Sequence, residues 1–234
     1  MAQSTASLRI GTRGSPLALV QARNVRARLS AALGMPEDAF ELVVIRTSGD
    51  IIQDRPLADV AGKGLFTKEI EEALLDGRID LAVHSAKDMP TFSQPGLMPA
   101  ACLEREDPRD VFISLKAPSL ADLPAGATLG TASLRRQAIA KRARGYLRVV
   151  PLRGNVETRL HKLEAGDVDA TILALAGMKR LGLAQHATWI MSTDEFLPAV
   201  GQGAIGIEVR ESDIRTREAL GRINHHDTLT ALTA

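Results

Sequence analysis

Four short stretches of this 234-residue sequence join a hydroxyl or amide side chain to a cation, where a β-rich run gives way to a helical one. A helix N-terminus presents unpaired N–H groups and partial positive charge, which attract anions. In an open α/β sheet such junctions also line the ligand crevice, so the pattern favours carboxylate binding. The stretches are Thr12-Arg13-Gly14-Ser15, His84-Ser85-Ala86-Lys87-Asp88, Thr131-Ala132-Ser133-Leu134-Arg135-Arg136 and Arg153-Gly154-Asn155.

Two of these stretches gather arginines at a helix start. Each exposed arginine in a first turn opposes the helix dipole by about 0.3–1 kcal/mol, so Arg135 and Arg136 predict a compensating negative group. Arg159 lies one helical turn after Asn155, and together with Arg153 these residues can hold a carboxylate. A single surface arginine is usually solvated or ion-paired, but several at such junctions favour a site for a small polycarboxylate.

Asp88 is the acidic residue among these cations, directly after Lys87. Two interpretations stay open. Asp88 is either a capping or salt-bridging carboxylate, or a group that hydrogen-bonds an N–H and stabilises a developing cation while arginines hold the ligand's acids. The second interpretation predicts acid–base or cation-stabilising chemistry.

The other chemically suggestive residues favour structural roles. Residues 201–206 match G-x-G-x-x-G, but they precede a β-rich run instead of opening a helix, which disfavours a nucleotide site. Cys102 lies in an apolar stretch that predicts a buried structural thiol. His225 and His226 predict a solvated pair, because adjacent side chains diverge around a helix. No Cys/His group has zinc-site spacing, so no metal is expected.

Composition narrows the class of partner. The net charge of +1 and the aromatic content of 3% disfavour nucleic acid. A single cysteine cannot form an internal disulfide, which indicates a reducing, cytoplasmic setting. A short polar N-terminus, and the lack of an apolar run of about 18 residues, argue against secretion and membrane insertion.

The elements that must position these residues alternate between β-rich and amphipathic helical runs, which is typical of α/β proteins. Ser15 and Pro16 predict a helix start, and Gly34 predicts its end. The alternation breaks at 91–110 and at 118–126 and then resumes, which predicts a second α/β unit. Expected strands are 8–12, 41–46, 81–84, 128–130, 147–151, 170–174 and 205–209; expected helices are 16–33, 65–76, 133–144, 156–165 and 213–223.

The motifs together resemble the porphobilinogen deaminase, or hydroxymethylbilane synthase, family. They occur in the family's order and cover nearly the entire chain. Any one of them is a weak signal, but the ordered set is specific. The matching strings are RIGTRGSPLAL (9–19), GKGLF (62–66), VHSAKDMP (83–90), EREDPRDV (104–111), GTASLRR (130–136), LRGNV (152–156) and PAVGQG (198–203).

This resemblance implies an α/β fold with two lobes like those of type II periplasmic binding proteins and an active-site cleft between them. Domain 1 would span 1–103 and be completed by 203–224, and domain 2 would span 104–202. Residues 225–234 would begin a helix leading to a third domain that is missing here.

The resemblance also implies a reaction, the stepwise head-to-tail condensation of porphobilinogen into linear hydroxymethylbilane with release of ammonia, in tetrapyrrole biosynthesis. Asp88 matches the catalytic aspartate, which hydrogen-bonds pyrrole nitrogens and stabilises the azafulvene cation formed as ammonia leaves. Substrate- and cofactor-binding positions match Arg13, Ser15, Gln21, Lys63, Phe66, Ser85, Lys87, Thr131, Ser133, Arg135, Arg136, Arg153, Gly154, Asn155, Arg159 and Gln202.

The family's cofactor is a dipyrromethane, thioether-linked to a cysteine of the third domain, on which synthesis is primed. Cys102 matches no such position, so the chain alone is expected to lack the cofactor and to be inactive. Its partners would be porphobilinogen and pyrrole-chain intermediates, and a monomer is expected. The alternatives are a non-catalytic two-lobe binding module for a small polycarboxylate and, less favoured without a preceding helix-turn-helix segment, a regulator's effector domain.

Overall fold

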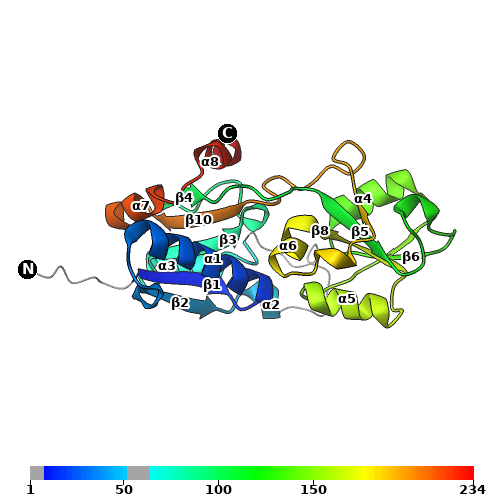
Figure 1. The fold of residues 1–234 in the computed structure, drawn as a ribbon, viewed down its shortest axis with the longest axis horizontal. Coiled ribbons are helices and arrows are strands. Elements are labelled where there is room, and N and C mark those ends of the chain that lie inside the picture. Colours follow the sequence, from blue (N-terminus) through cyan, green and yellow to red (C-terminus); the bar gives the residue numbers. More distant parts are fainter. Residues whose placement is uncertain (1–7, 52–63) are drawn as a thin grey trace, which may run out of the picture. The chain divides into compact units, whose positions relative to one another are not determined.

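The computed structural model describes residues 8–51 and 64–234, which form two α/β units (Figure 1). Unit 1 holds the described residues up to Glu106 together with Ala204–Ala234, and unit 2 holds Asp107–Gly203. The chain therefore leaves unit 1 after Glu106 and returns to it at Ala204. The domain boundaries expected from the sequence stay a prediction.

The sheet of unit 1 has five strands in the order β2-β1-β3-β10-β4. β1 runs parallel to β2 and β3, whereas β10 is antiparallel to both β3 and β4. The late strand β10, orange in Figure 1, thus inserts between two early strands. The strands are β1 (Leu8–Arg13), β2 (Phe40–Ile45), β3 (Leu81–Ser85), β4 (Leu97–Cys102) and β10 (Ile205–Arg210).

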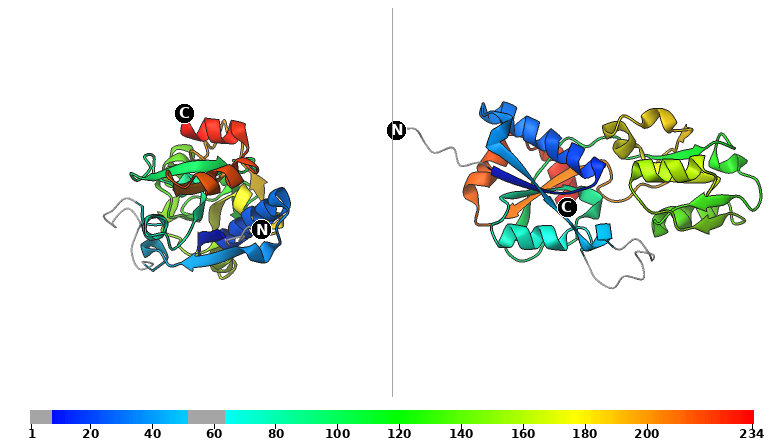
Figure 2. Two further views of the ribbon diagram at one scale, coloured as in Figure 1. Left: turned by 90° about the vertical axis from the view of Figure 1, so that its left-hand side faces the viewer. Right: turned by 90° about the horizontal axis from the view of Figure 1, so that it is seen from below.

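Helices cover both faces of this sheet, with α1 (Pro16–Leu33) and α3 (Lys68–Leu75) on opposite sides (Figure 2, right). α1 begins where predicted, because the Ser15 side chain accepts a hydrogen bond from the Ala18 amide, and it ends at Gly34 in the left-handed conformation. The other helical elements are α2 (Ser48–Ile51), α7 (Ile214–Gly221), α8 (His226–Thr233) and the 3-10 helices η1 (Glu37–Ala39) and η3 (Ala86–Asp88).

Successive side chains of a strand point to opposite faces of the sheet, so unit 1 has a separate hydrophobic core on each face. On the α1 face, Val25 and Leu29 pack with Ile10 and other strand residues. On the α3 face, Ile70 and Leu74 belong to a second cluster. Both clusters contain side chains with no exposed surface, so the strands that carry the candidate site are held from two sides.

Unit 2 repeats the architecture with the sheet order β7-β6-β8-β5-β9. β6 is parallel to β7 and β8, and β5 is antiparallel to β8 and β9. Its elements are β5 (Asp110–Ser114), η4 (Leu120–Asp122), β6 (Thr128–Gly130), α4 (Leu134–Ala143), β7 (Arg148–Val150), α5 (Val156–Glu164), β8 (Ala170–Ala174), α6 (Leu175–Arg180), η5 (Ala184–His186) and β9 (Trp189–Ile190).

One strand, β4, falls inside 91–110, where the sequence predicted only a break in the α/β pattern, and β5, which was not predicted, begins at the last residue of that segment. β4 contains Pro99, which reads as a strand breaker, but β4 is the edge strand and a missing N–H is tolerated there. β5 begins with the charged Asp110 and is buried along its whole length. The prediction of an irregular 91–110 segment is therefore wrong for 97–102.

Candidate active site

The turn that carries Asp88 is fixed by its backbone. β3 ends at Ser85 and the chain enters η3, where the Ala86 amide donates to the Ala204 carbonyl at 3.0 Å and the Met89 amide to the Ala86 carbonyl at 3.1 Å. The side chains of Lys87 and Asp88 are exposed. Asp88 forms no ion pair within the described part of the chain, so the structure does not support the salt-bridge interpretation, and the carboxylate is accessible to a ligand.

A buried amide supports the start of this turn. The Gln21 side chain, 2% exposed on α1, donates from Nε2 to Ser85 Oγ at 2.9 Å, and Ser85 Oγ lies 3.2 Å from Gln21 Oε1. The two predicted site residues are 64 positions apart in sequence and are brought together by packing of α1 on β3. Their contact ties α1 to the turn that carries Asp88.

The glycines of segment 201–206 are explained by backbone conformation and packing, not by a nucleotide site. Gly201 and Gly203 have φ angles of 68° and 93°, which glycine adopts without strain. Gly206 faces Met89, and a Cβ added to Gly206 would lie 2.5 Å from Met89 Sδ. Gly206 therefore leaves room for the residue that follows Asp88.

Replacing Gly206 with Ala is expected to destabilise the protein by about 1–3 kcal/mol, because the added methyl overlaps Met89. Chemical denaturation measures the change. The double variant Gly206→Ala/Met89→Ala removes the overlap, so its loss should be smaller than the sum of the two single losses. Strict additivity would contradict the proposed contact.

Arg13, at the end of β1, is paired with a carboxylate of the same unit. Its guanidinium contacts Asp50, with Nε 3.2 Å from both carboxylate oxygens, and it lies 4.2 Å from the centre of the Phe66 ring. Thr47 Oγ1 donates to Asp50 at 2.8 Å. Burial alone would raise the pKa of Asp50, but bonds from Arg13 and Thr47 outweigh it and lower that pKa. The sequence predicted Arg13 and Phe66 but missed Asp50.

The predicted arginine pair of unit 2 converges on one buried carboxylate, Asp110. Arg135 and Arg136 each place a terminal nitrogen 2.7 Å from a different oxygen of Asp110. Gln202 donates from Nε2 to Asp110 Oδ1 at 2.9 Å and to the Pro108 carbonyl at 2.7 Å. The compensating negative group expected at this helix start is therefore a residue of the chain itself, one that sequence reasoning did not single out.

Hydroxyl side chains complete this helix start. Thr131 Oγ1 accepts from the Ser133 amide at 3.1 Å, and Ser133 Oγ caps α4 by accepting from the Arg136 amide at 3.4 Å. Burial favours the neutral form of Asp110, but the charges of Arg136 and Arg135 outweigh it and hold the pKa of Asp110 below its usual range. The carboxylate is ionised at neutral pH.

The third arginine stretch forms the loop before α5. Gly154 has φ of 119°, and a Cβ there would lie 2.7 Å from Thr158 Cγ2, so the position needs glycine. Asn155 Oδ1 caps α5 by accepting from the Thr158 amide at 2.8 Å. Arg159 Nε donates to the Gly154 carbonyl at 2.9 Å. The loop is thus ordered by its own polar groups, and the shared carboxylate site of Arg153, Asn155 and Arg159 stays a prediction.

Unit 1 buries three ionisable side chains, on α3, β3 and β10, that were not connected from the sequence. Glu71, His84 and Glu208 are 6%, 5% and 1% exposed. Burial lowers the pKa of His84 to about 4, with the charge of Arg13 adding to the effect. Burial and the charge of Glu71 raise the pKa of Glu208 to about 7. His84 Nε2 is 3.7 Å from Glu208 Oε2, which is too long for a hydrogen bond, and because His84 is neutral above about pH 4 the contact is not an ion pair at neutral pH.

Three further predictions concern residues outside these groups. Cys102 is fully buried and burial raises the pKa of its thiol to about 11, which confirms the structural thiol. His225 accepts the Thr228 amide at 3.3 Å and caps α8, so the solvated pair is wrong for this residue. Lys63 lies outside the described residues.

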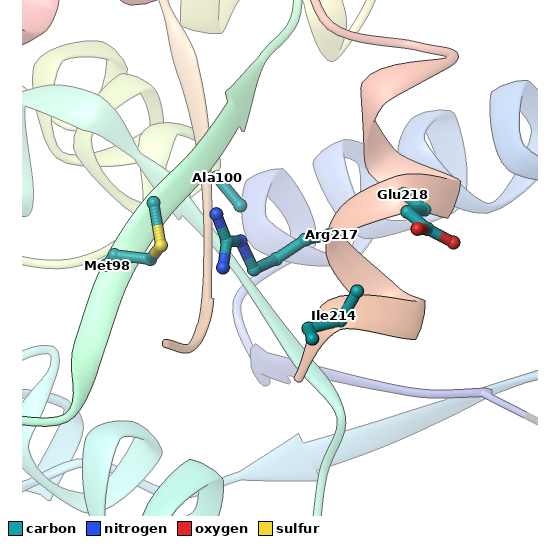
Figure 3. Close-up of a pocket in the computed structure, with 5 residues that line it drawn as sticks. All are labelled: Met98, Ala100, Ile214, Arg217 and Glu218. Carbon is teal, nitrogen blue, oxygen red and sulfur yellow. The ribbon is translucent and has the colours of Figure 1, made fainter. Parts of the chain in front are cut away.

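A surface pocket of unit 1 is separate from the predicted site residues. It lies between β4 and α7, where Arg217 extends toward Met98 and Ala100 (Figure 3). Within residues 8–51 and 64–234, no cluster of three or more His, Cys, Asp or Glu side chains is arranged to bind a metal. No helix in the same residues is long and apolar enough to cross a membrane.

The family model and the similar sequences point to the same protein family. The family model described as "Porphobilinogen deaminase, dipyromethane cofactor binding domain" matches residues 8–218. A porphobilinogen deaminase from Nitrobacter winogradskyi is 62% identical over 225 residues, which cover 96% of this chain and 71% of the relative. The chloroplastic porphobilinogen deaminase of Oryza sativa subsp. japonica is 57% identical over 234 residues, which cover 99% of this chain and 65% of the relative.

Solved structures confirm the predicted fold class. An ABC transporter periplasmic substrate-binding protein from Coxiella burnetii matches with a TM-score of 0.55 at 16% identity, covering 96% of this chain and 94% of that protein. Identity at this level speaks for the two-unit α/β fold alone. The family follows from the sequence relatives and the family model, and on their evidence the chain belongs to the porphobilinogen deaminase family.

Proposed function

We propose that this chain supplies the catalytic and pyrrole-binding residues of a hydroxymethylbilane synthase, a transferase that condenses porphobilinogen head to tail and releases ammonia. The observation that carries the proposal is the exposed Asp88 carboxylate on a backbone-fixed turn, in a chain matched by the family model over residues 8–218. Porphobilinogen and the growing pyrrole chain are its ligands. The monomeric, cytoplasmic state expected from the sequence stays a prediction.

Asp88 is the proposed catalytic residue. When ammonia leaves the aminomethyl group of porphobilinogen, positive charge develops on the pyrrole, and a carboxylate that accepts the pyrrole N–H stabilises that charge. A carboxylate already paired with an internal cation would be a weak partner. Asp88 has no such pair within the described residues, so its full charge is available to the ligand.

The arginines are the proposed holders of the ligand's acetate and propionate groups. Arg135 is the best supported, because among the described residues only two of its five N–H groups are engaged, one with Asp110 and one with the Leu197 carbonyl. Its side chain is 24% exposed, so the remaining donors can reach a ligand. Charge-assisted bonds of this kind contribute about 1.5–3 kcal/mol each.

The residues also fit the family's dipyrromethane cofactor. That group carries carboxylates, and unit 2 offers spare cationic donors for them: those of Arg135, and the buried Nε of Arg136, which has no hydrogen-bond partner among the described residues. When bound, the dipyrromethane supplies the pyrrole terminus to which the first substrate unit is joined. Arg135 and Arg136 would bind its acids, and Asp88 would accept a pyrrole N–H.

Replacing Arg135 with Leu is expected to raise the KM for porphobilinogen by about tenfold or more, because a charge-assisted bond to the ligand is lost. Steady-state consumption of porphobilinogen measures the effect, with the protein extended through the family's cofactor-bearing domain because the chain alone is expected to be inactive. Arg142→Leu is the matched control, since Arg142 is an exposed arginine of the same helix. An unchanged KM in Arg135→Leu would refute the assignment.

Ammonia release separates the enzyme from the alternative of a polycarboxylate-binding module. The protein extended through the family's cofactor-bearing domain, incubated with porphobilinogen, should release one ammonia for each unit consumed. Binding of porphobilinogen, measured by calorimetry, with neither consumption nor ammonia release would favour the binding module instead.

A further inference from the structure

Asp110, the first residue of β5, is a buried carboxylate outside the proposed catalytic group. Its side chain has no exposed surface, and its three side-chain partners are Arg135, Arg136 and Gln202. A buried charge is tolerated only when it is paired and hydrogen-bonded. Because two guanidinium groups face one carboxylate, the cluster keeps a surplus positive charge.

The two arginines of the cluster differ in exposure. The side chain of Arg136 is 7% exposed and lies inside the unit, whereas that of Arg135 is 24% exposed. Arg135 is also held at its other end, since one terminal nitrogen donates to the Leu197 carbonyl at 2.5 Å and the other to Asp110 at 2.7 Å. Its guanidinium lies 5.9 Å from the centre of the Phe196 ring.

These contacts fix the guanidinium plane of Arg135 before any ligand arrives. A free arginine side chain carries about 2 kcal/mol of rotamer entropy, and ordering it during binding weakens affinity. Gln202 strengthens the arrangement, because its amide joins Asp110 to the Pro108 carbonyl and so fixes the carboxylate itself. The direction of Arg135 is therefore set from β5, 25 residues away in sequence.

We infer that Asp110 is a positioning residue: it sets the direction of Arg135 so that the remaining donors of that guanidinium meet a ligand carboxylate. The inference rests on the proposed function of Arg135. Asp110 itself touches no ligand, since it has no exposed surface and its oxygens face the two arginines and Gln202.

A double-mutant cycle tests this coupling. Asp110→Asn keeps the side-chain volume but turns one acceptor into a donor, which releases one arginine. The KM for porphobilinogen should rise roughly tenfold, the factor that corresponds to ordering one long side chain, with a much smaller change in kcat. In an Arg135→Leu background the same substitution should change KM by less than about twofold, because its target is gone.

Asp169→Asn is the matched control. Asp169 is a paired carboxylate of the same unit that accepts the Thr128 amide at 2.7 Å and binds Lys116. Its loss should lower thermal stability without changing KM. If Asp110→Asn does not fold, Asp110→Glu, which keeps the charge and displaces it by one methylene, replaces it in the same cycle.

The outcomes separate the inference from the function on which it rests. If Arg135→Leu alone leaves KM unchanged, the proposed role of Arg135 fails. A second outcome is that Arg135→Leu raises KM, and Asp110→Asn then raises KM by the same factor in the Arg135→Leu background as in the unmodified protein. In that case Asp110 does not act through Arg135, and the inference is overturned. The same holds if Asp110→Asn, like Asp169→Asn, lowers stability and leaves KM unchanged.

Discussion

Replacing Asp88 with Asn should lower the rate of porphobilinogen consumption by at least about a hundredfold, within the range that acid–base and charge-stabilising side chains contribute. Asn has the same shape but no charge, so it cannot offset the positive charge that develops on the pyrrole as ammonia leaves. The turn itself should survive, because η3 is held by backbone hydrogen bonds and Asp88 is exposed.

The measurement pairs turnover with thermal unfolding, both on the protein extended through the family's cofactor-bearing domain. Asp88→Asn should keep the unfolding temperature of the unmodified enzyme, and its affinity for porphobilinogen should stay within a few-fold, because the arginines that bind the acids are intact. Asp76→Asn, an exposed aspartate of the same unit, is the control and should leave turnover unchanged. Turnover retained by Asp88→Asn would remove Asp88 from the mechanism.

Replacing Glu208 with Gln should stabilise the protein at pH 8 and have little effect below pH 4.5. Burial and the charge of Glu71 raise the pKa of Glu208 from 4.5 to about 7. The folded state therefore binds more protons than the unfolded state between these values, and stability falls as the pH rises from 4.5 through 7. The difference between these two pKa values corresponds to roughly 3 kcal/mol of unfolding free energy, and this is the largest stabilisation that Glu208→Gln can give at pH 8.

Comparing the Glu208→Gln variant with the unmodified protein separates the pH-dependent contribution of Glu208 to stability from that of His84. Burial lowers the pKa of His84 from 6.5 to about 4, so His84 contributes a loss of stability as pH falls through that window. Both proteins share this contribution, and it cancels in the difference. Urea denaturation at pH 5 and pH 8 gives the free energies of unfolding, with exposed Glu211→Gln as the control.

If Glu208→Gln changed the free energy of unfolding equally at pH 5 and pH 8, ionisation of Glu208 would not be the cause of the change. A loss of stability at pH 8 would contradict the prediction too, since it would mean that the ionised carboxylate stabilises the fold. The predicted pattern is therefore a gain that grows with pH and levels off above about pH 8.

Sequence reasoning located the first helix because its signals are local. Ser15, Pro16 and Gly34 act within one turn of the helix ends, and the structure confirms both ends. β4 was missed for the opposite reason, since Pro99 is tolerated only because β4 lies at the edge of the sheet. Edge position is a property of the tertiary fold, and no local pattern reveals it.

Asp110, the carboxylate that pairs with Arg135 and Arg136, could not be predicted from local sequence either. The helix dipole correctly required a negative group near Arg135 and Arg136, but it could not distinguish a ligand from a residue of the chain. Asp110 is 25 and 26 positions away from its two arginines and stands in a charged segment that looks solvated. The tertiary fold, in which residues of α4 and β5 belong to one hydrophobic cluster, makes it their partner.

The position of β10 has a consequence for synthesis on the ribosome. β10 pairs with both β3 and β4, yet more than a hundred residues separate Cys102, the last residue of β4, from Ile205, the first of β10. Until the ribosome has released residues 205–210, β3 lacks its partner on one edge and β4 lacks its partner β10, whereas the described residues of unit 2, Asp107–Gly203, have all been made. The later part of the chain can thus become native first, reversing the usual N-to-C order of cotranslational folding.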